Sequence, residues 1–156
     1  MKNLIGKATI NPLLFYSGKI SGYVLWILLL QALLSTGWTI TMSLQKWITV
    51  IGLFIGLTFT VISLINLGKS TCLGIPGDTT AFKTNGLYRI SRNPMYLGFN
   101  LLTLSAVLYL KNFPVLIFGI YSIVIYHRII LGEEKFLENR FAEQYIKYRQ
   151  RVRRYI

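Results

Sequence analysis

Four long stretches of this 156-residue chain contain no Asp, Glu, Lys or Arg. They cover residues 20–45, 47–68, 93–110 and 112–127, the last with an apolar continuation to Leu131. An α-helix needs roughly 20 apolar residues to cross a bilayer, so the first two stretches are long enough and the last two are short. The pattern predicts an all-α, polytopic membrane protein with four transmembrane helices, at about residues 20–40, 47–67, 94–110 and 114–131.

The composition supports a membrane protein and argues against a nucleic-acid binder. Hydrophobic residues make up 53% of the chain and charged residues 14%, with a net charge of +12. A soluble domain normally carries about 25% charged residues, and a basic nucleic-acid binder is seldom so apolar. We therefore expect membrane lipids and no nucleic acid as partners. The length suits a single membrane-embedded domain over residues 1–156.

The cations lie mainly in three of the five segments that flank the apolar stretches. The two remaining loops carry one cation each, Lys46 and Lys111. By the positive-inside rule, both termini and the long loop 69–92 are expected in the cytoplasm. The first stretch is longer than the apolar region of a signal peptide, so we expect it to be retained. The cation-rich segments contain Lys2, Lys7 and Lys19, then Lys69, Lys83, Arg89 and Arg92, and finally Lys135 to Arg154.

Residues 133–153, which we call the tail, are predicted to form a separate helix after the fourth stretch. Apolar and aromatic residues recur there at spacings of four, four, three and four, which places them on one face. Seven cations accompany four carboxylates from residue 133 to residue 154, which is typical of an amphipathic helix lying on anionic headgroups. The predicted stripe consists of Leu137, Phe141, Tyr145, Tyr148 and Val152.

Two groups of polar residues flank the last two apolar stretches. Glu133 and Glu134 follow the fourth stretch directly, and Arg92 and Asn93 precede Pro94, which is suited to start the third helix. A helix N-terminus attracts anions, and Arg92 can hold a carboxylate with two hydrogen bonds. A ligand with a carboxylate and a cationic centre would satisfy both groups. Alternatively, the acids favour a helix N-terminus electrostatically and Arg92 reaches headgroups.

Tyr96 lies in the first turn of the third helix, where its ring can face a cation or belong to an interfacial aromatic belt. Gly52 and Gly56 form a GxxxG pattern that suits close packing against the first helix or a homodimer partner. Cys72 is the only cysteine, so no intramolecular disulfide forms, and no metal-ligand spacing is present. The loop 69–92 contains apolar residues and is expected to pack on the membrane surface or against the tail.

From about Thr80 to Val152 the chain resembles the integral-membrane methyltransferases that depend on S-adenosylmethionine. These include isoprenylcysteine carboxyl methyltransferases and phospholipid N-methyltransferases. The resemblance rests on the order and spacing of several motifs around a helical hairpin. They are Gly86-Leu87-Tyr88, Arg92-Asn93-Pro94-Met95-Tyr96-Leu97-Gly98, Glu133-Glu134, and the tail residues Phe141, Tyr145, Tyr148 and Val152.

The resemblance implies a cofactor pocket between the hairpin and the tail. Asn93 and Thr80 stand where the family frequently has His, and Asn93 cannot shuttle a proton near neutral pH. The implied catalytic residues are Arg92, Asn93 and Tyr96, with His127 and Arg128 as candidates for binding the acceptor. The implied cofactor contacts are Thr80, Ala81, Phe82, Lys83, Tyr88, Asn93, Pro94, Met95, Tyr96, Glu133 and Glu134.

Three functions remain open at this stage. The first is methyl transfer from S-adenosylmethionine to a hydrophobic or membrane-associated acceptor: an isoprenoid or prenylcysteine carboxylate, a lipid, or a thiol. The second is a related membrane reductase that uses NADPH. The third is a non-enzymatic adaptor that binds anionic lipid through its basic tail. The chain is expected to be an enzyme, because an adaptor does not require the Arg92 motif and the two adjacent glutamates together.

Overall fold

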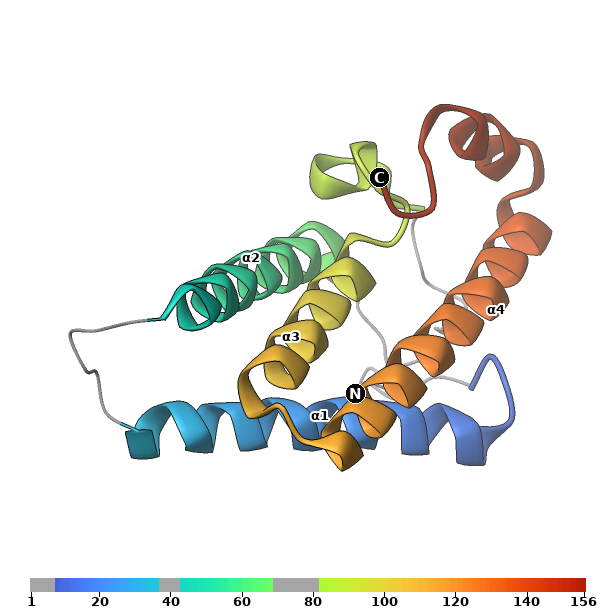
Figure 1. Cartoon of the computed structure of the whole chain (residues 1–156). Coiled ribbons are helices and arrows are strands. Elements are labelled where there is room, and N and C mark those ends of the chain that lie inside the picture. Colours follow the sequence, from blue (N-terminus) through green and yellow to red (C-terminus); the bar gives the residue numbers. More distant parts are fainter. Residues whose placement is uncertain (1–7, 37–42, 69–81) are drawn as a thin grey trace.

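The computed structural model describes residues 8–36, 43–68 and 82–156. These residues form four α-helices and one short 3₁₀ helix, with no strand among them, so the prediction of an all-α protein is confirmed (Figure 1). The helices are α1 (Pro12–Thr36), α2 (Leu44–Leu67), the 3₁₀ helix η2 (Gly86–Arg89), α3 (Pro94–Leu110) and α4 (Phe113–Arg151).

Three of these helices, and not four, are long and apolar enough to cross a membrane. They are α1, α2 and α4, which make the chain a multi-pass membrane protein. α3 has 17 residues and is about 26 Å long, whereas the hydrocarbon core is about 30 Å thick. The prediction of four transmembrane helices is therefore corrected at the third, residues 94–110: α3 is a shorter apolar helix.

α1 begins earlier than the predicted first span. Pro12 occupies its first turn, and the side-chain oxygen of Asn11 accepts a hydrogen bond from the backbone N–H of Leu13 at 2.9 Å. Both features are typical of a helix start. As a result Lys19, which was expected to precede the span, lies inside the helix and is only 4% exposed.

α3 packs against each of the other three long helices. Its contact with α2 is made by small residues: a Cβ on Gly98 would lie 2.7 Å from the carbonyl oxygen of Gly56. A Cβ on Gly52 would likewise meet the hydroxyl of Ser105. The GxxxG pattern therefore serves packing against α3 and not against the first helix. A homodimer through these glycines would have to displace α3.

A second close contact joins α1 to α4. A Cβ on Gly18 would meet Ile125, and one on Gly22 would meet Tyr126. The Ser122 hydroxyl donates a hydrogen bond to the carbonyl oxygen of Gly18 at 3.1 Å. This contact sets the position of α1 relative to the part of α4 that leads to Glu133.

α4 does not stop where the fourth span was expected to end. The helix continues through Gly132, and its only residue with non-helical angles is Ala142, at φ 41° and ψ −115°. The predicted separate helix over residues 133–153 is therefore corrected: the chain bends ten residues later than expected. Beyond the bend the chain turns back toward η2 and the start of α3 (Figure 1). The predicted stripe does face protein, with Tyr145 and Val152 buried.

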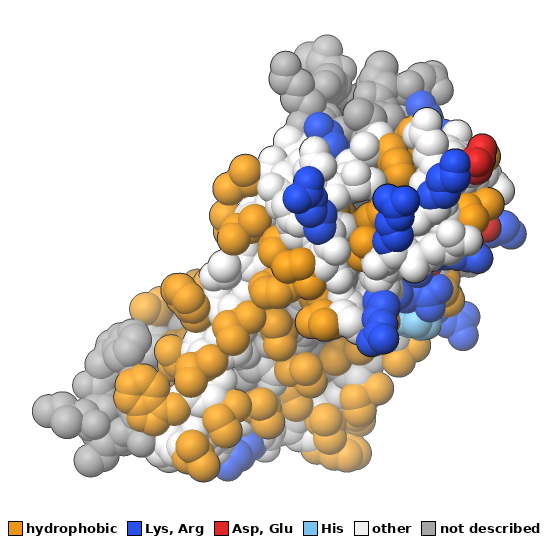
Figure 2. Space-filling view, turned by 90° about the horizontal axis from the view of Figure 1, so that it is seen from above, with side chains coloured by type: hydrophobic (Ala, Val, Ile, Leu, Met, Phe, Trp, Pro, Cys, Tyr) orange, Lys and Arg blue, Asp and Glu red, His pale blue; other side chains and the backbone are white. Residues whose placement is uncertain are grey.

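Charge and hydrophobicity are separated on the molecular surface. Figure 2 shows most of the visible Lys and Arg side chains gathered over one part of the molecule, and hydrophobic side chains over much of the rest of that face. The apolar helices expose large side chains such as Phe54, which is 71% exposed. Such an exposed apolar surface is suited to lipid.

Candidate functional site

The segment that joins η2 to α3 brings the predicted polar residues to one end of the helix bundle. Pro94 is the first residue of α3, as predicted, and Asn93 precedes the helix with φ −131° and ψ 52°. The backbone N–H of Arg92 donates to the carbonyl oxygen of Arg153 at 2.9 Å. The chain after the bend in α4 therefore lies directly against the start of α3.

Glu134 is the centre of the first polar group, which we call the Glu134 cluster: Ser91, Arg92, Asn93, Glu134 and Arg154. Arg92 donates to both carboxylate oxygens of Glu134, at 3.1 and 3.3 Å. The side-chain amide of Asn93 donates to Oε1 at 3.0 Å, and Arg154 donates to Oε2 at 2.9 and 3.0 Å. The Ser91 hydroxyl joins the cluster by donating to the carbonyl oxygen of Arg154.

Arg92 uses every nitrogen of its guanidinium group within the protein. Besides Glu134, it donates to the carbonyl oxygens of Val152 at 2.9 Å and Arg149 at 3.3 Å. Its side chain is only 8% exposed. In this structure Arg92 therefore holds the end of α4 against α3, and the carboxylate that it grips is the one on Glu134. Its predicted role toward a ligand stays a prediction.

Glu133 has entirely different surroundings, because adjacent residues on a helix point about 100° apart. The hydroxyl of Tyr96 donates to its Oε1 at 2.8 Å. Lys19 of α1 and Tyr88 of η2 lie close enough to interact electrostatically with its carboxylate. Elements that are distant in sequence thus meet at one carboxyl group. We call the four residues Lys19, Tyr88, Tyr96 and Glu133 the Glu133 site.

The two adjacent carboxyl groups have opposite pKa shifts, and both lie beyond the apolar part of α4. Burial raises the pKa of Glu133 to about 7, and the Tyr96 hydrogen bond and the charge of Lys19 only partly oppose this. For Glu134, burial also acts to raise the pKa, but the hydrogen bonds from Arg154, Arg92 and Asn93 outweigh it and lower the pKa. Divergent pKa values in neighbouring acids are typical of functional sites.

Lys19 is the residue of this site that sequence reasoning missed. It was counted among the cations that precede the first span, but it lies in α1 and its Nζ sits 4.4 Å from the centre of the Phe15 ring. The signal was available in the sequence: the predicted start of the span was set by Lys19 itself, although Pro12 marks the start of a helix. A cation enclosed within an apolar helix is costly and commonly functional.

The comparison with protein families decides what kind of chain this is. The family model described as phospholipid methyltransferase matches residues 24–144, more than three quarters of the chain. The chain belongs to the phospholipid methyltransferase family. No curated protein and no solved structure matches it. The family is thus a membrane methyltransferase family of the kind that the motifs predicted.

The matched range covers part of the polar end of the bundle. It includes Tyr88, Tyr96, Glu133 and Glu134. Lys19 precedes it, and Arg154 follows it. Both the buried cation at the Glu133 site and the arginine that completes the Glu134 cluster are therefore seen from the structure and not from the family match.

Phe82 and Tyr88 hold the segment before η2 against the end of α4. Phe82 stacks on Phe141 with 5.0 Å between ring centres and meets Tyr148 edge-on at 5.3 Å. The Tyr148 hydroxyl donates to the backbone carbonyl of Tyr88 at 2.6 Å. The described part of the loop thus packs against the tail, which is one of the two alternatives predicted for it. Thr80, Ala81 and Cys72 lie outside the described residues.

The remaining predicted contacts differ in exposure. Pro94 is buried and Met95 is half-buried against the hydrophobic core, whereas Lys83 is exposed. His127 and Arg128 are exposed as well, and His127 shares a 2.7 Å hydrogen bond with the hydroxyl of Tyr155. Among the described residues, neither of these two makes a hydrogen bond or ion pair with Glu133 or Glu134.

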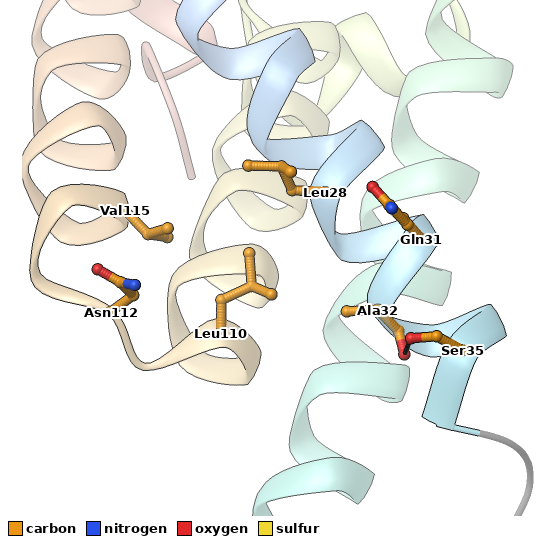
Figure 3. Close-up of a pocket in the computed structure, with 7 residues that line it drawn as sticks. All are labelled: Leu28, Gln31, Ala32, Ser35, Leu110, Asn112 and Val115. Atoms are coloured by element: carbon orange, nitrogen blue, oxygen red, sulfur yellow. Dashed lines mark hydrogen bonds between the residues drawn. The ribbon is translucent and has the colours of Figure 1, made fainter.

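A cavity of about 360 Å³ lies at the other end of the bundle (Figure 3). α3 runs from the Glu134 cluster to this cavity, so the two are separated by about 24 Å. The polar groups that line this cavity are amides and hydroxyls, which do not exchange protons near neutral pH. Among the described residues no group of three His, Cys, Asp or Glu could hold a metal ion. The cavity is lined by Leu28, Gln31, Ala32, Ser35, Leu110, Asn112 and Val115.

Proposed function

We propose that this protein transfers a methyl group from S-adenosylmethionine to a membrane lipid, and that the Glu133 site holds the cofactor. The family match supports methyl transfer to a lipid-type acceptor. The observation that carries the assignment of the site is the half-buried carboxyl group of Glu133, which receives a hydrogen bond from Tyr96 and interacts with a buried cation, Lys19. No other carboxyl group in the described residues has these surroundings.

The residues present fit the charges of the cofactor. S-adenosylmethionine carries an ammonium, a sulfonium and a carboxylate group. The carboxylate of Glu133 can pair with the ammonium, and Lys19 can pair with the carboxylate. The rings of Tyr88 and Tyr96 lie beside Glu133 and can face a sulfonium through cation–π attraction. The site therefore offers an oppositely charged group or an aromatic ring for each charged group of the cofactor.

When bound, the cofactor supplies an electrophilic methyl carbon. The chain's own residues must orient the donor and the acceptor and keep water away. Burial of Tyr96 and Lys19, at 3% and 4% exposure, provides a dry wall on the α1 and α3 sides. The exposed apolar surfaces of α1, α2 and α4 give a lipid acceptor lateral access to the bundle. Asn93 donates to Glu134 and cannot accept a proton from an amine.

The test is calorimetric titration of the detergent-solubilised chain with S-adenosylmethionine, with NADPH as the competing candidate. We expect Glu133→Gln to weaken S-adenosylmethionine binding by about tenfold or more, since a charge-assisted bond contributes about 1.5–3 kcal/mol. The matched control is Glu143→Gln: Glu143 is 79% exposed, and its ion-pair partner in the described part of the chain is Lys147. Equal affinities of the two variants would contradict the site, and binding of NADPH in place of S-adenosylmethionine would contradict the function.

A further inference from the structure

A second concave surface lies at the polar end of the bundle, between η2 and the part of α4 after the bend. It is a groove of about 480 Å³, and it contains none of the residues of the Glu133 site or the Glu134 cluster. The residues that line it come from the two sides: Phe82, Thr84 and Arg89 from one, and Gln144, Lys147, Tyr148, Arg151 and Val152 from the other.

The lining carries three cations and no carboxylate. Lys147 and Arg151 are one helical turn apart, a spacing at which like charges repel, and Arg89 faces them from the end of η2. Lys147 pairs with Glu143 at 2.7 Å, but both side chains are mostly exposed, and the attraction within such an exposed ion pair is weak. Arg89 and Arg151 make no ion pair with any described residue. The groove therefore concentrates positive charge that the described chain leaves largely uncompensated.

The shape of the groove is held by aromatic packing. Tyr148 is tied to η2 through its hydrogen bond to the Tyr88 carbonyl, and it meets Phe82 edge-on. Gln144, Lys147 and Arg151 follow at spacings of three and four residues, so they lie on one face of α4. The amide of Gln144 and the hydroxyl of Thr84 add hydrogen-bond donors beside the cations. Donors and cations together on a fixed surface are suited to a phosphate group.

We propose that this groove binds the phosphate of an anionic phospholipid headgroup. Lys and Arg side chains gather over one part of the molecule (Figure 2), and the groove between η2 and the end of α4 has three cations of its own. A basic surface next to the apolar helices of a membrane protein is suited to the level of the headgroups. A lipid anchored there can keep its chains against the exposed apolar helices. The proposal does not rest on methyl transfer, and the residues from Lys147 onward lie outside the range that the family model matches.

The experiment measures binding of short-chain phosphatidylglycerol to the detergent-solubilised full chain, with phosphatidylcholine of the same chain length and inorganic phosphate as the other ligands. The variant is Lys147→Gln/Arg151→Gln. We expect its dissociation constant for phosphatidylglycerol to rise by about fivefold per cation removed. The matched control is Lys135→Gln/Arg153→Gln, which removes two exposed cations of the same region that lie outside the groove. The control is expected to bind phosphatidylglycerol as the wild type does.

Equal weakening in both double variants would overturn the proposal, because a diffuse basic surface would then explain the affinity. Equal binding of phosphatidylcholine would show that acyl chains decide the affinity, and equal binding of inorganic phosphate would overturn the lipid assignment. If Lys147→Gln/Arg151→Gln does not fold, Arg89→Gln on the opposite wall makes the same test. Loss of phosphatidylglycerol binding in that variant supports the groove, and unchanged binding overturns it.

Discussion

The hydroxyl of Tyr96 donates a hydrogen bond to Glu133 across 2.8 Å, and this contact ties the first turn of α3 to the point where the apolar part of α4 ends. The same carboxyl group faces Lys19 from a third helix. The neighbouring Glu134 instead takes Arg92, Asn93 and Arg154 as partners. Glu134 thus joins the end of α4 to the start of α3, whereas Glu133 meets a tyrosine and a lysine from two other helices.

The raised pKa of Glu133 predicts a dependence of stability on pH. Glu133 titrates near 4.5 when unfolded and at about 7 in the folded chain, so its contribution is full below pH 4.5 and is lost as the pH rises to about 7. We expect the melting temperature of the wild type, relative to Glu133→Gln, to fall between pH 4.5 and pH 7 and then to level off. A difference that does not change over this range would show that the pKa of Glu133 is not raised in the folded chain.

The lowered pKa of Glu134 predicts the opposite sign in a different pH range. Its contribution is present above its unfolded pKa and is lost as the pH falls through the lower folded value. The melting temperature measured against pH therefore separates the contributions of the two glutamates to stability. Of the two, only the contribution of Glu133 changes between pH 4.5 and pH 7.

Arg92→Ala is expected to destabilise the fold strongly. It would leave Glu134, whose side chain is 8% exposed, with a single arginine partner, and it would free two backbone carbonyls near the end of α4. Breaking a buried ion pair costs about 3–5 kcal/mol, and the remaining Arg154 places the expected loss at about 3 kcal/mol. The measurement is chemical unfolding in detergent.

Arg149→Ala is the matched control for Arg92→Ala. Arg149 pairs with Glu138 at 3.1 Å, but the two side chains are 49% and 40% exposed. A pair this exposed contributes about 0–1 kcal/mol. Similar losses in the two variants would mean that Arg92 does not have the structural role assigned to it.

The bend in α4 predicts that Ala142→Gly stabilises the protein. Ala142 has φ 41° and ψ −115°, a region that residues with a Cβ rarely adopt. Strain of this kind costs about 1–3 kcal/mol, and glycine relieves most of it at an entropic cost of about 1 kcal/mol. We expect a net gain of about 1 kcal/mol in unfolding free energy. Ala32→Gly within the regular part of α1 serves as the comparison, where the same change should destabilise.

The membrane orientation predicted from the cations can be tested with reporters. Reporters placed at Asp78 and after Arg154 are expected in the cytoplasm, and one at Gln45 is expected outside. A reporter at Asn112 tests whether the 17 residues of α3 cross the membrane. Because α4 is long enough to cross, cytoplasmic reporters at both Asp78 and Arg154 require an external reporter at Asn112, with α3 crossing the bilayer despite its length. A cytoplasmic reporter at Asn112 would mean that α3 does not cross, and it would place the end of α4 outside. An external Asp78 reporter would contradict the predicted orientation.

Much of the fold follows from local features that the sequence displays. Pro94 was predicted to start α3, and Pro114 lies in the first turn of α4, because proline acts on its own backbone and on the residue before it. The apolar stretches predicted the helices, since helix formation and burial of apolar side chains depend on composition over about 20 residues. The family motifs around Tyr96 and Glu133 are likewise local, and they were readable without the structure.

The partners of the charged groups were decided only by the tertiary structure. Nothing near Ala142 in the sequence marks a bend, yet that bend returns Val152 and Arg154 to Arg92 and Glu134. Lys19 counted as a loop cation until the packing of α1 on α4 placed it beside Glu133. Residue type states that a charge is present, but burial and pairing are set by groups that are distant in sequence. Adjacent glutamates can therefore differ in pKa and in role only once the chain has folded around them.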